Sequence, residues 1–180
     1  MQEKQIVTAN NGVEIVLRPA VSEDAREIID TVSSVSPERS YVLMEKYGKD
    51  EETERKYITD MDRQHNLLLV AVAEGVIVGS LAALQENEGQ DPKTTHILNV
   101  GLHLTKAYRG LGIGSKMLQY AIDWARERGF RKLEANIFTV NSRSLKLFSN
   151  AGFVEEGTRR KQYRIGREFI DEVIVAKFLD

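Results

Sequence analysis

The strongest constraint in this sequence is a run of glycines that leads directly into an amphipathic helix. Gly110, Gly112 and Gly114 alternate with other residues, and apolar side chains then recur with the 3.6-residue period of a helix. The first backbone N–H groups of a helix have no partner inside it, and glycines let a ligand approach the backbone closely. The segment therefore predicts an anion-binding turn for a phosphorylated ligand.

Two common phosphate motifs fit this turn poorly. A P-loop requires G-x-x-x-x-G-K-[ST], which the segment GLGIGSK does not satisfy. A dinucleotide-binding turn requires G-x-G-x-x-G, and Ser115 stands at the place of its third glycine. Glu134 lies at the distance expected for a ribose contact, but the preceding strands read as a meander and not as parallel βαβ units. A nicotinamide-dependent oxidoreductase is therefore the weakest alternative.

The order of the other elements indicates one α/β domain over residues 1–180, with a mixed central sheet and helices on both faces. The expected elements are a strand (Val13 to Arg18), a helix capped by Ser22 and closed at Ser36-Pro37, a polar helix (Glu51 to Gln64), strands at Leu67 to Ala73, Val76 to Leu84 and Thr95 to Leu104, the helix after the glycines closed by Gly129, a strand (Lys132 to Phe138), a helix from Asn141 to Ala151-Gly152, and a hairpin (Phe153 to Arg164 and Glu168 to Leu179).

Composition excludes several classes of protein. The chain has 25 basic and 27 acidic residues, a formal charge of −2, which argues against a nucleic-acid partner. It has no cysteine, so disulfides and Cys-ligated zinc are excluded, and its histidines, His65, His96 and His103, have no metal-ligand spacing. Its apolar stretches are too short to span a bilayer, and its start lacks an apolar segment of signal-peptide length. We therefore expect a cytoplasmic protein without a metal or a membrane partner.

The glycine turn and a second motif downstream resemble the GCN5-related N-acetyltransferase (GNAT) family. Arg109 to Gly114 reads R-G-L-G-I-G and matches that family's [QR]-x-x-G-x-[GA] turn. Asn141 to Phe153 is similar to its N-x-x-[AS]-x-x-L-[YF]-x-x-x-G-F motif, and the two motifs have the family's order and spacing. The resemblance implies an acyl-CoA N-acyltransferase fold, with acetyl-CoA as the acyl donor and an amine as the acceptor.

The resemblance also implies where acetyl-CoA lies. In the family two parallel strands splay apart and hold the pantetheine arm, and the corresponding strands here are Asn99 to Leu104 and Lys132 to Phe138. Asn141 can act equally as a plain N-cap, and the side chain of Ile113 is expected in the core. The residues expected at acetyl-CoA are the backbone of Leu102 and Leu104, the amides of Arg109, Gly110, Leu111, Gly112, Ile113, Gly114 and Ser115, and the positions of Asn141, Ser144 and Phe148.

The sequence departs from the family at the catalytic positions. Phe148 stands where the family carries a tyrosine that protonates the leaving thiolate, and phenylalanine has no proton to give. Tyr163 and Tyr108 are candidate acids by residue type. Asn136 stands where related enzymes for protein N-termini carry a glutamate base, which leaves Glu134 and His103 as candidate bases. The missing tyrosine and the missing glutamate base indicate an alternative function, in which the chain is a non-catalytic acyl-CoA-binding or sensing module.

The lack of a strong catalytic base restricts which class of amine the enzyme can use as the acceptor. Freeing a lysine-type amine of its proton at pH 7 costs roughly 4–5 kcal/mol, whereas an α-amine costs only about 1–1.5 kcal/mol. We therefore expect the α-amino group of an amino acid or of a peptide N-terminus as the acceptor. The resemblance also allows a homodimer, although the sequence identifies no interface.

Two further groups of side chains remain open in function. Tyr41, Tyr47 and Tyr57 lie in the region that shapes the acceptor site in the family. The final hairpin carries a cluster of cations that either forms a solvated face or attracts an anionic acceptor or a phosphate of CoA. These cations are Arg159, Arg160, Lys161, Arg164 and Arg167.

Overall fold

The structure is a computed structural model that describes residues 4–35, 48–85, 89 and 91–179. In this part of the chain eight strands form one mixed sheet in the order β1-β2-β3-β4-β5-β6-β8-β7. The strands are β1 (Gln5–Thr8), β2 (Glu14–Pro19), β3 (Leu67–Ala73), β4 (Val76–Gln85), β5 (Ile97–Leu104), β6 (Lys132–Phe138), β7 (Val154–Ile165) and β8 (Glu168–Phe178). The helices are α1 (Ala25–Val35), α2 (Glu51–Asp60), α3 (Ile113–Glu127) and α4 (Ser142–Asn150), with short 3-10 turns η1 (Ser22–Asp24) and η3 (Lys106–Tyr108).

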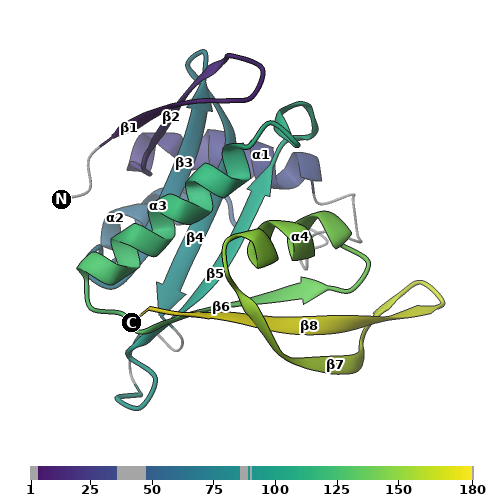
Figure 1. Cartoon of the computed structure of the whole chain (residues 1–180). Helices are drawn as coiled ribbons and strands as arrows, with labels where there is room; N and C mark the ends of the chain where they lie inside the picture. The colour runs from purple at the N-terminus through teal and green to yellow at the C-terminus, as the bar shows by residue number, and fades with distance from the viewer. Residues whose placement is uncertain (1–3, 36–47, 86–88, 90, 180) are drawn as a thin grey trace.

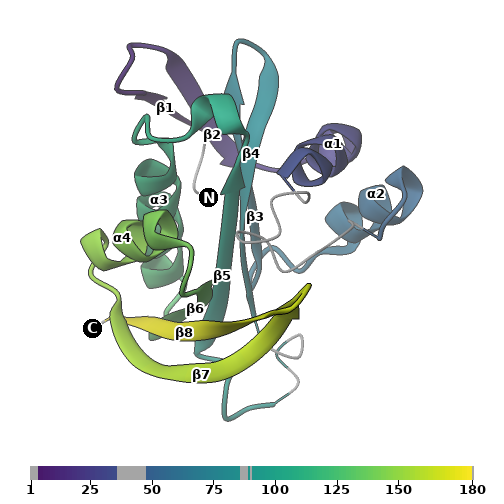
Figure 2. The same ribbon diagram turned by 90° about the vertical axis from the view of Figure 1, so that its right-hand side faces the viewer.

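The sheet separates two layers of helices (Figures 1 and 2). α3 and α4 cover one face, while α1 and α2 cover the other. Each face has its own core, because alternate residues of a strand point to opposite sides. Leu69 and Ala71 of β3 belong to the core under α3, whereas Val70 belongs to the smaller core under α1 and α2. The predicted mixed sheet with helices on both faces is confirmed.

Three details of the sequence prediction are wrong, and the first is the end of the polar helix, which lies at Asp60 and not at Gln64. The strand β1 was not expected, because its four residues pair only with β2 at the edge of the sheet and carry no alternation strong enough to identify it. Ser22 is not the cap of the first helix. Val21 is the N-cap of η1, which leads directly into α1, and the carboxylate of Asp24 accepts a hydrogen bond from the Val21 amide at 2.8 Å. The predicted stop at Ser36-Pro37 lies outside the described residues.

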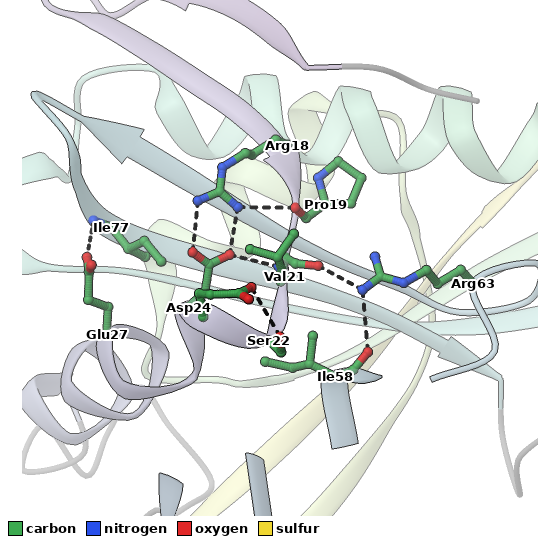
Figure 3. A network of polar contacts seen from close by, with 11 residues as sticks. Arg18, Pro19, Val21, Ser22, Asp24, Glu27, Ile58, Arg63 and Ile77 are labelled. Atoms are coloured by element: carbon green, nitrogen blue, oxygen red, sulfur yellow. Dashed lines mark hydrogen bonds and ion pairs between the residues drawn. The ribbon is translucent and has the colours of Figure 1, made fainter. Parts of the chain in front are cut away.

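Polar contacts attach the α1 and α2 layer to the sheet (Figure 3). Arg18 of β2 binds both carboxylate oxygens of Asp24, at 2.6 and 2.8 Å. Glu27 of α1 accepts a hydrogen bond from the amide of Ile77 on β4 at 2.9 Å. Arg63, just after α2, donates to the carbonyl of Ala20 at 3.0 Å. These bonds connect η1, α1 and the segment after α2 to β2, to β4 and to the residue that follows β2. They therefore fix both helices on this face of the sheet.

A membrane-spanning helix and a group of metal-ligating side chains are both absent from the described residues. None of the helices found there is long and apolar enough to cross a membrane. No group of three or more His, Asp or Glu side chains there is placed to hold a metal ion.

Candidate active site

The candidate active site begins where two neighbouring parallel strands separate. β6 pairs with β5 only at Ile97, Leu98 and Asn99. Beyond this point β5 stays bonded to β4 as far as Leu104, and β6 stays bonded to β8 as far as Phe138. Figure 1 shows the two strands diverging. The strand edges that face this gap carry backbone N–H and C=O groups without a strand partner in the described sheet, which suits an extended ligand.

A cavity of about 460 Å³ occupies the gap. Consecutive residues of both strands line it, Val100 to His103 on β5 and Ala135 to Phe138 on β6. Successive residues of a strand point to opposite faces of the sheet, so a cavity lined by consecutive residues lies between the strands and reaches both faces. Residues of α4 line one side, and residues of α1 and α2 line the other. Two ligands can therefore meet in this cavity from opposite faces.

The glycine turn at the open end of the gap has the backbone of an anion site. Gly110 and Gly112 have φ angles of 76° and 78°, in the left-handed region that favours glycine. α3 begins at Ile113, and its N-cap Gly112 provides no side-chain hydrogen bond to the amides of the first turn. The side chain of Ile113 is buried in the core, as expected, whereas Ser115 is exposed. The helix end therefore presents backbone donors and a positive dipole at the gap.

Hydrogen bonds fix this turn to the neighbouring strands. Arg109 Nε donates to the carbonyl of Leu104 at 2.8 Å, which ties the turn to the end of β5. The Asn10 amide donates to the carbonyl of Leu111 at 2.9 Å. Of the two leucines expected to face the pantetheine arm, Leu102 lines the cavity, while Leu104 is buried and its carbonyl already accepts one hydrogen bond.

α4 begins on the other side of the gap and places the second motif at the cavity. Asn141 is the N-cap, and its Oδ1 accepts a hydrogen bond from the Ser144 amide at 3.0 Å. The predicted cap is therefore confirmed, and both residues line the cavity together with Phe148. The buried ring of Phe148 packs edge-on against Phe153, with 4.9 Å between ring centroids. The position of the family's acid is thus apolar and faces the cavity.

His103 is the one candidate base that the described structure brings to the cavity wall. The Thr31 hydroxyl donates to the carbonyl of Ile28 at 2.9 Å, so it accepts from His103 Nε2, which lies 3.2 Å away. This assigns the proton to Nε2 and leaves the lone pair on Nδ1, 3.4 Å from the Ser80 hydroxyl. Burial, and then the charge of Arg109, lower the pKa of His103 to about 4. The imidazole is therefore neutral at physiological pH.

Glu134 does not line the cavity. It stands opposite Asn99, at the closed end of the gap, where β5 and β6 still pair. Its carboxylate lies 2.6 Å from Lys132 Nζ, which also binds Glu156 at 2.7 Å. The structure therefore places this candidate base in a network of ion pairs, at the last paired position of β5 and β6 before the gap opens.

Tyr163 also lies outside the cavity lining, and its ring packs edge-on against that of Phe138, with 4.9 Å between ring centroids. Its hydroxyl donates to Glu172 Oε1 at 2.7 Å, and Glu172 is fully buried. Burial and this hydrogen bond raise the pKa of Tyr163. A raised pKa and a committed hydroxyl make the side chain a poorer proton donor, and the contact supports a structural role.

The structure describes the hairpin cations and part of the tyrosine group, whose functions the sequence left open. Tyr57 lines the cavity from α2, whereas Tyr41 and Tyr47 lie outside the described residues. On the hairpin, Arg159 Nη1 lies 2.7 Å from Glu172 Oε2, so one of the five cations neutralises a buried carboxylate.

Sequence reasoning missed several cavity residues on the side of α1 and α2. Gly101 faces the cavity from β5, beside Ala82 of β4, with which it is in register. Lys49 and Glu54 line it from the α2 region. An isolated glycine inside a strand is a known sign of close approach by another group, so Gly101 carried a usable signal. Lys49 and Glu54 carried none, because they lie in a charged segment typical of a solvated helix.

The fold and the site together define a protein with a cavity between two parted parallel strands and a glycine turn whose backbone suits an anion. The comparisons with known proteins identify its family. Residues 34–153, two thirds of the chain, match the model of the acetyltransferase (GNAT) family, and the chain belongs to this family. It is an N-acetyltransferase by this membership.

Curated relatives and solved structures agree with this membership. The chain is 26% identical over 120 residues to the L-amino acid N-acetyltransferase AaaT of Escherichia coli, an alignment covering 64% of this chain and 70% of that protein. It is 33% identical over 101 residues to the N-alpha-acetyltransferase RimI of Mycobacterium tuberculosis, covering 56% and 60%. A GNAT acetyltransferase from Streptococcus pneumoniae superposes with a TM-score of 0.86 at 25% identity, over 92% of this chain and 99% of that one. A phosphinothricin acetyltransferase from Sinorhizobium meliloti, solved with acetyl-CoA, gives 0.83 at 21% identity, over 96% and 89%.

Proposed function

We propose that this protein transfers the acetyl group of acetyl-CoA to the α-amino group of a small molecule or a peptide N-terminus. The observation that carries the proposal is the cavity between β5 and β6, which reaches both faces of the sheet and has a neutral histidine on its wall. Acetyl-CoA would enter along α3 and α4. The amine would enter from the side of α1 and α2.

The residues at the gap fit the donor. The uncapped first turn of α3 and the left-handed glycines suit the diphosphate, and Arg109 adds a positive charge to the same turn. The unpaired edge of β5 near Leu102 suits the amides of the pantetheine arm. Asn141, Ser144 and Phe148 line the cavity where that arm would end. A phosphinothricin acetyltransferase of the same fold is solved with acetyl-CoA, which supports this choice of ligand.

The reaction moves one acetyl group and one proton. The neutral amine attacks the thioester carbonyl, the new C–N bond forms, and the C–S bond breaks to release the CoA thiolate. The proton lost by the nitrogen ends on that thiolate. His103 Nδ1 is the base on the cavity wall that can carry this proton, and Phe148 provides no second acid.

The low basicity of His103 selects the amine. A pKa of about 4 means that His103 cannot readily deprotonate a free ammonium ion. Transfer of a proton to it would cost about 5 kcal/mol from an α-ammonium and about 9 kcal/mol from a lysine-type ammonium. The acceptor must therefore arrive neutral, and at pH 7 an α-amine does so far more often. The names of two relatives, an L-amino acid and an N-alpha acetyltransferase, agree with this class.

A panel of acceptors tests the proposal. Thiol release from acetyl-CoA should be seen with amino acids or N-terminal peptides and be at least about tenfold slower with polyamines and aminoglycosides. For a peptide acceptor, log kcat/KM should rise with a slope near one up to the amine pKa of about 8 and then level. His103 should add no second ionisation above pH 6, since its pKa is about 4.

The outcomes of the panel separate the alternatives. Equal turnover of spermidine and α-amines would overturn the choice of acceptor class. No turnover of any amine, with acetyl-CoA binding confirmed by thermal shift, would favour the non-catalytic acyl-CoA-binding module, which the apolar Phe148 position supports. Loss of both activity and acetyl-CoA binding would show that the glycine turn has been assigned wrongly.

Paired substitutions of Asn141 separate its capping role from contact with acetyl-CoA. Asn141→Ala should lower the free energy of unfolding by about 1 kcal/mol, because the first turn of α4 loses its cap. Asn141→Ser keeps a capping oxygen and should stay within a few tenths of a kcal/mol of the parent. Both variants should bind acetyl-CoA about 3- to 10-fold more weakly by calorimetry, the effect of one lost hydrogen bond. Full affinity in Asn141→Ser would mean that Asn141 only caps the helix.

A further inference from the structure

A buried carboxylate and a lysine form part of the cavity wall on the acceptor side. Glu54 of α2 is only 1% exposed, and its Oε2 lies 3.1 Å from Lys49 Nζ. The same ammonium lies 3.5 Å from the centre of the Tyr57 ring. All three residues line the cavity that also contains His103 and Gly101. The contacts hold the ammonium of Lys49 at one place on this wall.

Lys49 and Glu54 differ in how far their side chains are exposed, and this difference indicates a different role for each. A carboxylate with 1% of its side chain exposed has no surface to offer a ligand, and it requires a partner because an unpaired buried charge is strongly unfavourable. Lys49 keeps 34% of its side chain exposed. Glu54 is therefore a positioning residue, and Lys49 is the member of the pair that a ligand can reach.

Glu54 balances the charge of Lys49, but the pair exposes only its ammonium, since the Lys49 side chain is 34% exposed and the Glu54 side chain 1% exposed. Among the described residues that line the cavity, the ionisable side chains are Lys49, Glu54, His103 and Tyr57. His103 is neutral because burial lowers its pKa to about 4. A tyrosine is neutral at pH 7. Among the described lining residues, the ammonium of Lys49 is thus the exposed charged group that a ligand entering from the side of α1 and α2 would meet.

We infer that Lys49 binds a carboxylate of the acceptor, so that the acceptor is an amino acid with its carboxylate free. This inference rests on the proposed function, because it requires an α-amine to react in this cavity. An ammonium contact to a carboxylate is charge-assisted and roughly twice as strong as a neutral hydrogen bond. It would also disfavour polyamines, whose remaining ammonium groups would face a like charge.

The test compares each amino acid with its own primary amide. The amide keeps the side chain and the α-amine and loses only the negative charge. The quantity measured is the ratio of kcat/KM for the acid to kcat/KM for the amide, first in the parent and then in Lys49→Met. The substrates are the same in both enzymes, so differences in amine ionisation cancel between the two ratios. The ratio should fall at least tenfold in Lys49→Met, while the rate on the amide changes less than threefold.

Three variants serve as controls. Lys56→Met removes a lysine of α2 that forms an exposed ion pair with Asp60, and it should leave the ratio unchanged. Lys49→Arg keeps the charge and should retain most of the preference. Glu54→Gln should raise KM for the acid with little change in kcat, since it releases Lys49 without removing it. Unchanged acetyl-CoA affinity in each variant shows that the fold is intact.

The inference and the proposed function fail in different ways. An acid-to-amide ratio that is the same in the parent and in Lys49→Met would overturn the inference while acetylation of α-amines continues. Turnover of peptide N-termini without any turnover of free amino acids would overturn it as well. Failure of the proposed function itself would appear as no acetylation of any α-amine, by any of these enzymes.

Discussion

Gly101→Leu should lower kcat/KM for the acceptor by about 100-fold and leave the affinity for acetyl-CoA within about threefold. Gly101 lies on the face of β5 that carries His103, and a Cβ built on it meets no atom within 4 Å. Its φ is not in the left-handed region, so a side chain is allowed there. An isobutyl group would fill the acceptor side of the cavity, and an obstruction of this kind costs about 1–3 kcal/mol, or roughly 5- to 150-fold.

Size and position controls make this result specific. Gly101→Ala should stay within about threefold of the parent, because a methyl group leaves most of the cavity open. Gly157→Leu makes the same change on β7, where a Cβ also meets nothing within 4 Å but the residue does not line the cavity. It should leave acceptor kinetics unchanged. Parent-like kinetics in Gly101→Leu would mean that the amine does not pass this strand, and loss of acetyl-CoA binding would mean that the donor fills this side.

The parts of the site that follow from local chemistry could be predicted from the sequence. Gly112 as a left-handed residue before α3, and Asn141 as the cap of α4, each depend on a few consecutive residues. The same holds for the helix–strand alternation from Lys132 onwards. Such signals are contained in the chain itself, because they reflect the conformational freedom of glycine and the unpaired amides of a helix end.

The acceptor side could not be predicted in this way, because it depends on where two strands stop pairing. Glu134 and Asn136 stand on the same face of β6, and only the register with β5 shows that Glu134 is still paired with Asn99 while Asn136 lines the gap. Long-range pairing likewise decides that Tyr163 donates to Glu172 and not into the cavity. Sequence position alone made Glu134 a candidate base with the same standing as His103.

Ser115→Glu should weaken acetyl-CoA binding by about 10- to 100-fold and at the same time stabilise the free protein. Ser115 is exposed in the first turn of α3, two residues after its start at Ile113. A carboxylate in the first turn of a helix interacts favourably with the dipole, by about 0.3–1 kcal/mol, which corresponds to a rise of roughly 1–4 °C in Tm for a chain of this size. The same carboxylate would repel a diphosphate bound at that turn.

The opposite signs of the two effects are what identify the ligand site. A variant that damaged the fold would lose stability and affinity together, whereas a competing charge raises one and lowers the other. Ser115→Gln is the matched control, since it has the size of glutamate without the charge and should bind acetyl-CoA within about threefold of the parent. The loss in Ser115→Glu should also shrink at high salt, because ions screen exposed charges. Equal losses in both variants would indicate steric obstruction, and parent-like affinity in Ser115→Glu would place the diphosphate away from α3.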